Sequence, residues 1–243
     1  MIGTFVNIAA ILAGAVVGLR RRGDLSPARQ DLIKKILGIF TVWIGLSQTW
    51  AGLHGGFWSA LRQVLFVILA MALGRLAGRF LGLQHAFNRL GQYAKRQFAR
   101  AVPGARSSLS EGFVTCAVLF CATPLAVLGS LHEGLWGAYK TLLIKSCMDG
   151  LATIAFARAF GAGVMLSAVP VLACQGTITL VAQALEPFLR EQALLDSVGA
   201  AAGMLIFAVA LVILEIRKVA LADYLPSLVF APLLAWLWAL WSR

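Results

Sequence analysis

The sequence predicts an all-α protein whose helices form a polytopic transmembrane bundle. Three observations lead to this fold class: 60% of the 243 residues are hydrophobic, 13% are charged, and the mean hydropathy is +0.85. Soluble domains carry about 25% charged residues, so a soluble globular protein is excluded. The apolar residues gather into runs of about 20, the length that a helix needs to cross a bilayer.

These runs predict eight spans in a single integral membrane domain, residues 1–243. The spans lie near 2–19, 36–53, 57–74, 111–131, 140–160, 163–185, 198–215 and 220–241. The fifth and sixth almost touch at Gly161-Ala162-Gly163, which predicts a tight helical hairpin. A likeness between spans 1–3 and 6–8, suggested by a few matching glycines, would be an inverted repeat that makes spans 1 and 6 a crossing pair.

The positions of Lys and Arg predict the orientation of the spans. The net charge is +11, and cytoplasmic loops retain positive charge. Most of the bases follow spans 1, 3, 5 and 7, and the opposite loops and terminus hold only Arg62, Lys140, Arg190 and Arg243. We therefore expect both termini outside and basic loops in the cytoplasm. On this interpretation the excess charge reflects the membrane and not a nucleic acid partner.

The longest loop predicts an amphipathic interfacial helix near 84–101. Its apolar residues recur at spacings of three and four, with bases between them. They are Phe87, Leu90, Tyr93, Ala94, Phe98 and Ala101, alternating with Arg89, Lys95, Arg96 and Arg100. Such a helix is attracted to anionic lipid on the inner leaflet, where it would act as an anchor or, alternatively, in regulation.

Small residues at four-residue spacing mark close helix contacts, because they let two backbones approach in lipid. Gly74, Gly78 and Gly82 form such a series at the inner end of span 3, and Gly14 and Gly18 form one in span 1. Two interpretations of the series in span 3 stay open: packing within one chain, or a homodimer through Gly74, Gly78 and Gly82.

Lys145 and Asp149 are the most informative polar residues, because a charge within the bilayer is costly and usually functional. They are four residues apart on one face of span 5, close enough to pair. One interpretation is a structural salt bridge. The other is a titratable pair on a solute or proton pathway.

Proline and glycine predict interruptions in spans 4 and 6, which flank this pair in the chain. Span 4 contains Thr123-Pro124 followed by Gly129-Ser130, and span 6 contains Val169-Pro170 followed by Gln175-Gly176-Thr177 and Thr179. Interrupted helices supply many transporter sites; a simple proline kink is the alternative.

Other sequence features favour no enzyme, no cofactor and no metal site. The sequence has no P-loop and no G-x-S-x-G or H-E-x-x-H motif, and we expect His54, His85 and His132 in separate loops. Cys116, Cys121, Cys147 and Cys174 lie in apolar runs without metal-ligand spacing, so we interpret them as small apolar residues.

Several spaced motifs resemble those of a bacterial family of multi-pass proteins. They are Met1-Ile2-Gly3-Thr4-Phe5-Val6-Asn7, Glu111-Gly112-Phe113-Val114-Thr115, Lys145-Ser146-Cys147-Met148-Asp149-Gly150, Val169-Pro170 with Gln175-Gly176-Thr177-Ile178-Thr179, and Leu225-Pro226. The chain is similar along its whole length to the YdfK/YqgA-like group, domain of unknown function 554. This resemblance implies a bacterial inner-membrane protein of unknown activity, described at most as a candidate transporter.

Taken together, the residues predict a small secondary transporter or permeation protein for a small, anionic or ion-coupled solute. The site would lie at the membrane midplane between spans 1, 4, 5 and 6. Its predicted residues are Lys145, Asp149, Gln175, Thr177, Thr179, Asn7 and Ser130. The alternative is a membrane scaffold or sensor that acts through its basic cytoplasmic loop without transporting a solute.

Overall fold

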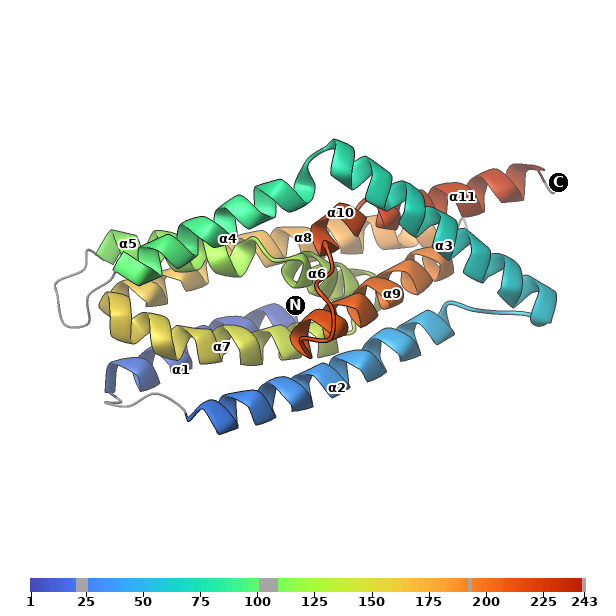
Figure 1. Ribbon diagram of the computed structural model, residues 1–243. Coiled ribbons are helices and arrows are strands. Elements are labelled where there is room, and N and C mark those ends of the chain that lie inside the picture. Colours follow the sequence, from blue (N-terminus) through green and yellow to red (C-terminus); the bar gives the residue numbers. More distant parts are fainter. Residues whose placement is uncertain (21–25, 101–108, 192–193, 242–243) are drawn as a thin grey trace. The chain divides into compact units, whose positions relative to one another are not determined.

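The computed structural model describes residues 1–20, 26–100, 109–191 and 194–241, and every regular element among them is a helix (Figure 1). The first elements are α1 (Ile2–Arg20), α2 (Pro27–Ala51), α3 (Phe57–Phe80), α4 (Leu83–Arg100), α5 (Leu109–Cys121) and α6 (Pro124–Trp136). They are followed by α7 (Lys140–Phe160), the 3-10 helix η1 (Gly161–Ser167), α8 (Ala168–Glu191), α9 (Leu195–Ile213), α10 (Leu221–Tyr224) and α11 (Ser227–Trp241). The all-α fold class is confirmed.

Several of these helices are long and apolar enough to cross a membrane. Within the described residues, five helical stretches meet this criterion, or six when the bent pair α5 and α6 is taken as one span. The stretches are Ile2–Arg20, Phe57–Phe80, Lys140–Arg190, Leu195–Ile213 and Leu221–Trp241. Helix α2 is not among them, and α7 and α8 count together. The total of eight therefore stays a prediction.

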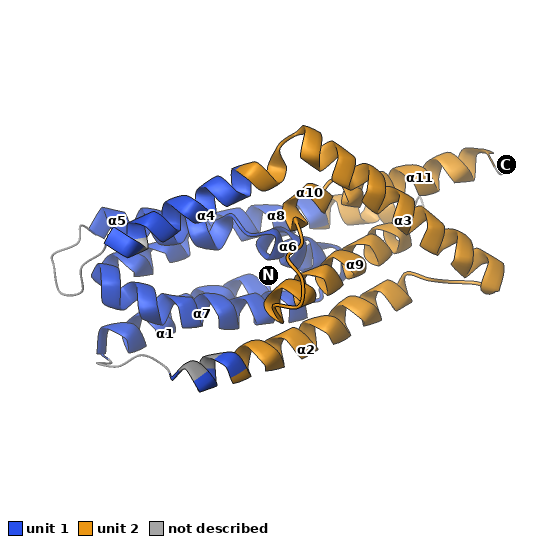
Figure 2. Ribbon diagram, in the orientation of Figure 1, with its two compact units in different colours: residues 1–31, 86–182 blue, residues 32–85, 183–243 orange. Residues whose placement is uncertain are grey.

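The chain divides into two compact units, each built from two separate stretches of sequence (Figure 2). Unit 1 comprises residues 1–31 and 86–182, and unit 2 comprises residues 32–85 and 183–243. Unit 1 thus contains α1, the beginning of α2, most of α4, and then α5, α6, α7, η1 and the first part of α8. Unit 2 contains most of α2 together with α3, the last part of α8, α9, α10 and α11.

In unit 1, α1 packs along α7 through the glycine face that the sequence predicts. A methyl group at Gly14 would overlap the carbonyl oxygen of Gly150, and one at Gly18 would overlap the carbonyl oxygen of Ile154. The two helices run parallel, since Gly3 lies against Leu142 at their other end. Span 1 therefore packs mainly against span 5. This corrects the expectation that spans 1 and 6 form the crossing pair.

The predicted hairpin between spans 5 and 6 is present. Gly161 ends α7 with a φ of +75°, a conformation that glycine adopts without strain, and η1 follows. The chain then reverses its direction. Gly176 of α8 lies against the Met1 side chain at the beginning of α1, and the same end of α1 contacts Leu142 near the beginning of α7. Unit 1 has its core here, formed by Ile11, Cys116, Phe120, Phe160, Val164 and Val171.

Span 4 is interrupted where the sequence predicts. Helices α5 and α6 meet at an angle of 61°. Thr123 is extended, as a residue before proline prefers, and its hydroxyl oxygen accepts a hydrogen bond from the Ala126 amide at 3.2 Å. Pro124 begins α6, where its missing N–H costs no helical hydrogen bond.

The irregular part of span 6 lies earlier than predicted. It is η1, whereas α8 is continuous through Gln175-Gly176-Thr177. Pro170 falls in the first turn of α8, a position at which a helix tolerates proline. The proline therefore starts this helix instead of breaking it.

Unit 2 is packed through small residues. A methyl group at Gly74 would overlap the backbone of Ser227, and one at Gly78 would overlap the carbonyl oxygen of Asp223. These two glycines therefore pack within the chain, as one of the two interpretations expects. Ala70, Ala201 and Ala231 form the core between α3, α9 and α11. A homodimer stays a prediction.

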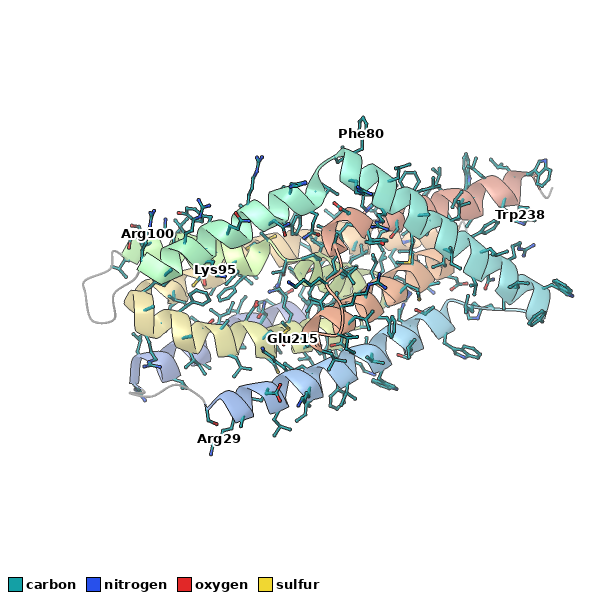
Figure 3. All side chains as sticks on the ribbon, in the orientation of Figure 1. Arg29, Phe80, Lys95, Arg100, Glu215 and Trp238 are labelled. Carbon is teal, nitrogen blue, oxygen red and sulfur yellow. The ribbon has the colours of Figure 1, made fainter. Side chains whose placement is uncertain are left out.

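The predicted interfacial helix is α4, and it carries exposed bases that include Lys95 and Arg100 (Figure 3). Ala94, on the apolar face, is 1% exposed. The prediction's last residue, Ala101, lies outside the described residues, as do Arg21, Arg22, Arg106 and Arg243, which contribute to the predicted charge bias.

Candidate functional site

A cluster of polar side chains lies inside unit 1, where α1, α6, α7 and α8 come together. Six of the seven predicted site residues belong to it, and all six are buried: Asn7, Ser130, Lys145, Asp149, Gln175 and Thr179. Hydrogen bonds join α1 to α7, α6 to α7 and α6 to α8 within this cluster. Spans 1, 4, 5 and 6 therefore meet as the sequence predicts.

Lys145 and Asp149 form an ion pair on α7, one turn apart. The Lys145 amine also lies 6.0 Å from the centre of the Phe120 ring, a distance at which a cation is attracted to an aromatic face. Asp149 Oδ2 accepts a second hydrogen bond from Asn7 Nδ2 at 3.1 Å. The pair thus links α7 to α1. This geometry is compatible with both interpretations of the pair, structural and functional.

Helix α8 contributes Gln175 and Thr179, which lie one turn apart and are both fully buried. The Thr179 hydroxyl donates a hydrogen bond to the backbone oxygen of Ser130 on α6 at 3.2 Å. The structure does not place Thr177 with them, because Thr177 is exposed. A residue two positions away on a helix is rotated by about 200° and faces the other side, which explains this difference from the prediction.

Several buried polar atoms in this cluster have no hydrogen-bond partner within the described part of the chain. They are Asn7 Oδ1, Ser130 Oγ, and both Oε1 and Nε2 of Gln175. An unpaired buried polar group costs about 1–3 kcal/mol, so folded proteins rarely keep several together. Donors and acceptors from three helices are thus available to a solute, an ion or water.

The sequence prediction missed two buried residues of α6, Glu133 and His132. Glu133 is 2% exposed, and its Oε1 accepts a hydrogen bond from the backbone amide of Gly3 at 2.7 Å. His132 is 3% exposed, and its Nδ1 lies 2.9 Å from the Thr141 hydroxyl. The expectation that His132 lies in a loop is therefore wrong, whereas His85 lies in α4, the helix predicted within the longest loop.

The sequence nevertheless contains a signal that α6 continues beyond residue 131, where the predicted span 4 ends. Hydropathy ends span 4 near residue 131, because His132 and Glu133 interrupt the apolar run. Leu135 and Trp136 continue the apolar pattern, and α6 ends only at Gly137, whose φ is +66°. Glycine is the residue that most often follows a helix in this left-handed conformation.

Comparisons with known proteins agree with the resemblance in the motifs. A family profile described as "Protein of unknown function (DUF554)" matches residues 2–236. The uncharacterized membrane protein YdfK of Bacillus subtilis is 30% identical over 232 residues, which cover 96% of this chain and 94% of YdfK. The uncharacterized protein YqgA of Escherichia coli is 28% identical over 243 residues, which cover 99% of each chain. No solved structure matches the chain significantly.

The family profile spans nearly all of the helices described above, including the four that form the buried polar cluster. YdfK is described as a membrane protein, and several helices of this chain are long and apolar enough to cross a membrane. The chain therefore belongs to the DUF554 family and is a membrane protein.

Proposed function

We propose that this protein is a secondary transporter or permeation protein for a small, anionic or ion-coupled solute. The site lies in unit 1 between α1, α6, α7 and α8. The observation that carries the proposal is the set of buried polar atoms of Asn7, Ser130 and Gln175 that have no partner among the described residues, in the same unit as the buried Lys145–Asp149 pair. A solute that passes through the site supplies the hydrogen bonds that these atoms lack.

The charged and neutral residues have different roles in this proposal. Asp149 is the carboxylate that responds to a proton or cation, and Lys145 is its counter-charge or an anchor for an anion. Asn7, Ser130, Gln175 and Thr179 are neutral ligands. The break between α5 and α6 adds helix ends, of the kind that transporters use at the midplane. The site binds and passes the solute without a chemical step.

We further propose that the protein lies in the bacterial inner membrane with both termini outside and its basic loops in the cytoplasm. Helix directions within each unit support this topology. In unit 1, α1 and α7 are parallel, as spans 1 and 5 are in the prediction, so Arg20 and Arg158 lie at the same end. In unit 2, α2 and α9 are antiparallel, since Gly38 meets Leu214 and Gly52 meets Asp196.

A binding screen tests the proposed function while the identity of the solute is still open. Purified protein in lipid nanodiscs is heated with small anions, amino acids or metal cations, and a solute that binds the folded state raises the melting temperature. The matched variants are Thr179→Val and Thr177→Val, the same change on the buried and exposed faces of α8. We expect Thr179→Val to reduce the shift and Thr177→Val to preserve it.

Two outcomes of this screen would count against the proposed site. If no solute in any class stabilises the protein, the proposal of a solute site loses its support. If a solute stabilises both variants equally, the solute binds elsewhere. The change in melting temperature that each solute produces is compared with the change that sodium chloride produces at the same ionic strength. This control separates binding from a general effect of salt.

The exposed bases of α4 support a second candidate function, a membrane scaffold or sensor that transports no solute. Arg89, Lys95, Arg96 and Arg100 are all exposed, and each such base near an anionic surface contributes about 1 kcal/mol. On this alternative, reversing these charges abolishes function while Asp149→Asn is silent. The transporter proposal expects the opposite ranking.

A further inference from the structure

Glu133 holds its carboxylate at the beginning of α1. Its Oε1 accepts a hydrogen bond from the Gly3 amide at 2.7 Å, and its Oε2 accepts one from the Thr4 hydroxyl at 3.4 Å. The α-amino group of Met1 lies 3.4 Å from Oε1. The first turn of a helix has free N–H groups and the positive end of the helix dipole, so it favours an anion. Here a side chain of the protein occupies that position.

Unpaired polar side chains point to a ligand beside this contact. Ser130, whose hydroxyl is buried without a partner within the described residues, lies three residues before Glu133 on the same face of α6. Gln175 lies on the same face of α8 as Thr179, which bonds to the Ser130 backbone. The next residue, Gly176, lies against the Met1 side chain. Gln175, whose fully buried amide has no partner within the described part of the chain, thus directly precedes a residue of α8 that lies against Met1.

We infer that the first turn of α1 is the anion-binding end of the solute site, that Glu133 occupies it when the site is empty, and that the solute is a small carboxylate. This inference rests on the proposed function and names its substrate class. The Gly3 amide and the Thr4 hydroxyl bind the solute carboxylate, and the Ser130 hydroxyl and the Gln175 amide donate to the rest of the solute.

Proton uptake follows from this exchange. Two carboxylates cannot share the few donors at the start of α1 without strong repulsion. The solute anion therefore binds as Glu133 takes up one proton from the buffered solution and leaves the position as a neutral acid, so that the charge of the site is conserved. The other titratable groups toward the same end of the elements packed around it include the Met1 α-amino group on α1, His132 on α6, and Lys140, Lys145 and Asp149 on α7. Within unit 1, α8 brings no charged side chain.

The test measures acetate binding and proton uptake by the full chain in nanodiscs between pH 5.5 and 7.5, with chloride as the comparison anion. One coupled proton makes acetate affinity fall about tenfold per pH unit, and a pH indicator in weak buffer records about one proton taken up per acetate bound. In Glu133→Gln we expect the pH dependence to shrink to less than about twofold and proton uptake to vanish. The control is Glu111→Gln, the same change at an exposed position of α5, which keeps the wild-type behaviour.

Several outcomes would overturn the inference. One is pH-dependent acetate binding with proton uptake that persists in Glu133→Gln, and another is chloride binding as tight as that of acetate. If Glu133→Gln does not fold, Thr4→Val takes its place, because it removes one donor and should weaken acetate binding about tenfold. If acetate fails to bind while another solute is carried in an Asp149-dependent way, the inference is wrong and the proposed function stands. If no solute is bound or carried, both fail.

Discussion

Asn7 and Asp149 are 142 residues apart in the chain, and the Asn7 amide donates a buried hydrogen bond of 3.1 Å to the Asp149 carboxylate. This contact joins the first membrane helix to the helix that carries the ion pair. The Asn7 amide oxygen is buried as well and has no partner among the described residues.

Asn7→Ala should destabilise the protein, because Asp149 loses a donor while remaining buried. A hydrogen bond to a charged group contributes about 1.5–3 kcal/mol. Unfolding in mixed micelles of mild detergent and dodecyl sulfate measures this loss. A change below about 0.5 kcal/mol, which is usual for exposed positions, would show that the contact contributes little.

A double-mutant cycle on Lys145 and Asp149 separates the two interpretations of the ion pair. Removing one partner leaves a buried charge without compensation and should cost about 3–5 kcal/mol, whereas replacing both by apolar residues is often neutral. We therefore expect Asp149→Leu to be unstable and Lys145→Met/Asp149→Leu to regain most of that stability. The double variant should still carry no solute. A stable double variant with wild-type transport would show that the pair is structural.

Gly14→Ala and Gly91→Ala should change stability in opposite directions. A methyl group at Gly14 meets the backbone of α7, which cannot move aside, so α1 and α7 must separate. Gly91 lies in α4 with open space where a methyl group would go, and alanine there should stabilise the helix by about 0.5–1 kcal/mol. Both values come from the same detergent unfolding series. Gly14→Ala with wild-type stability would contradict the packing of α1 on α7.

The proposed orientation predicts which side of the membrane each loop faces. In a variant with all four native cysteines replaced by alanine, Arg62→Cys should react with a membrane-impermeant maleimide in intact spheroplasts. Arg96→Cys should react only after lysis. Both positions are exposed, so accessibility depends on the side of the membrane. The reverse labelling pattern would contradict the proposed orientation and show that the termini face the cytoplasm.

The sequence predicts the helices and several members of the buried polar cluster, because the signals involved are local. Apolar runs define the spans, and Thr123-Pro124 disfavours helix on its own, so the break between α5 and α6 is visible without the structure. Lys145 and Asp149 are recognisable because four residues make one helical turn. Asn7 is recognisable only as a polar residue in an apolar run, since its partner lies on a distant span.

The errors have equally physical causes. The string Gln175-Gly176-Thr177-Ile178-Thr179 looks like one polar segment, but a continuous helix sends Gln175 and Thr179 to one face and Thr177 to the other. Glu133 is absent from the predicted site because a charged residue lowers the local hydropathy and so marks the end of the predicted span. Its burial depends on donors at the start of α1, which only the tertiary structure brings near.

Solute flux in proteoliposomes tests the central claim most directly. Wild-type protein and Asp149→Asn are reconstituted at equal density, and the uptake of the solute identified by the binding screen is measured with and without a proton or sodium gradient. Asn has nearly the shape of Asp and cannot titrate. We predict that Asp149→Asn is less stable than the wild type, because the buried Lys145 amine loses its ion-pair partner, but that the folded, inserted fraction of this variant loses gradient-dependent uptake. Gradient-dependent uptake at the wild-type rate in a folded Asp149→Asn variant would contradict the proposed role of this carboxylate.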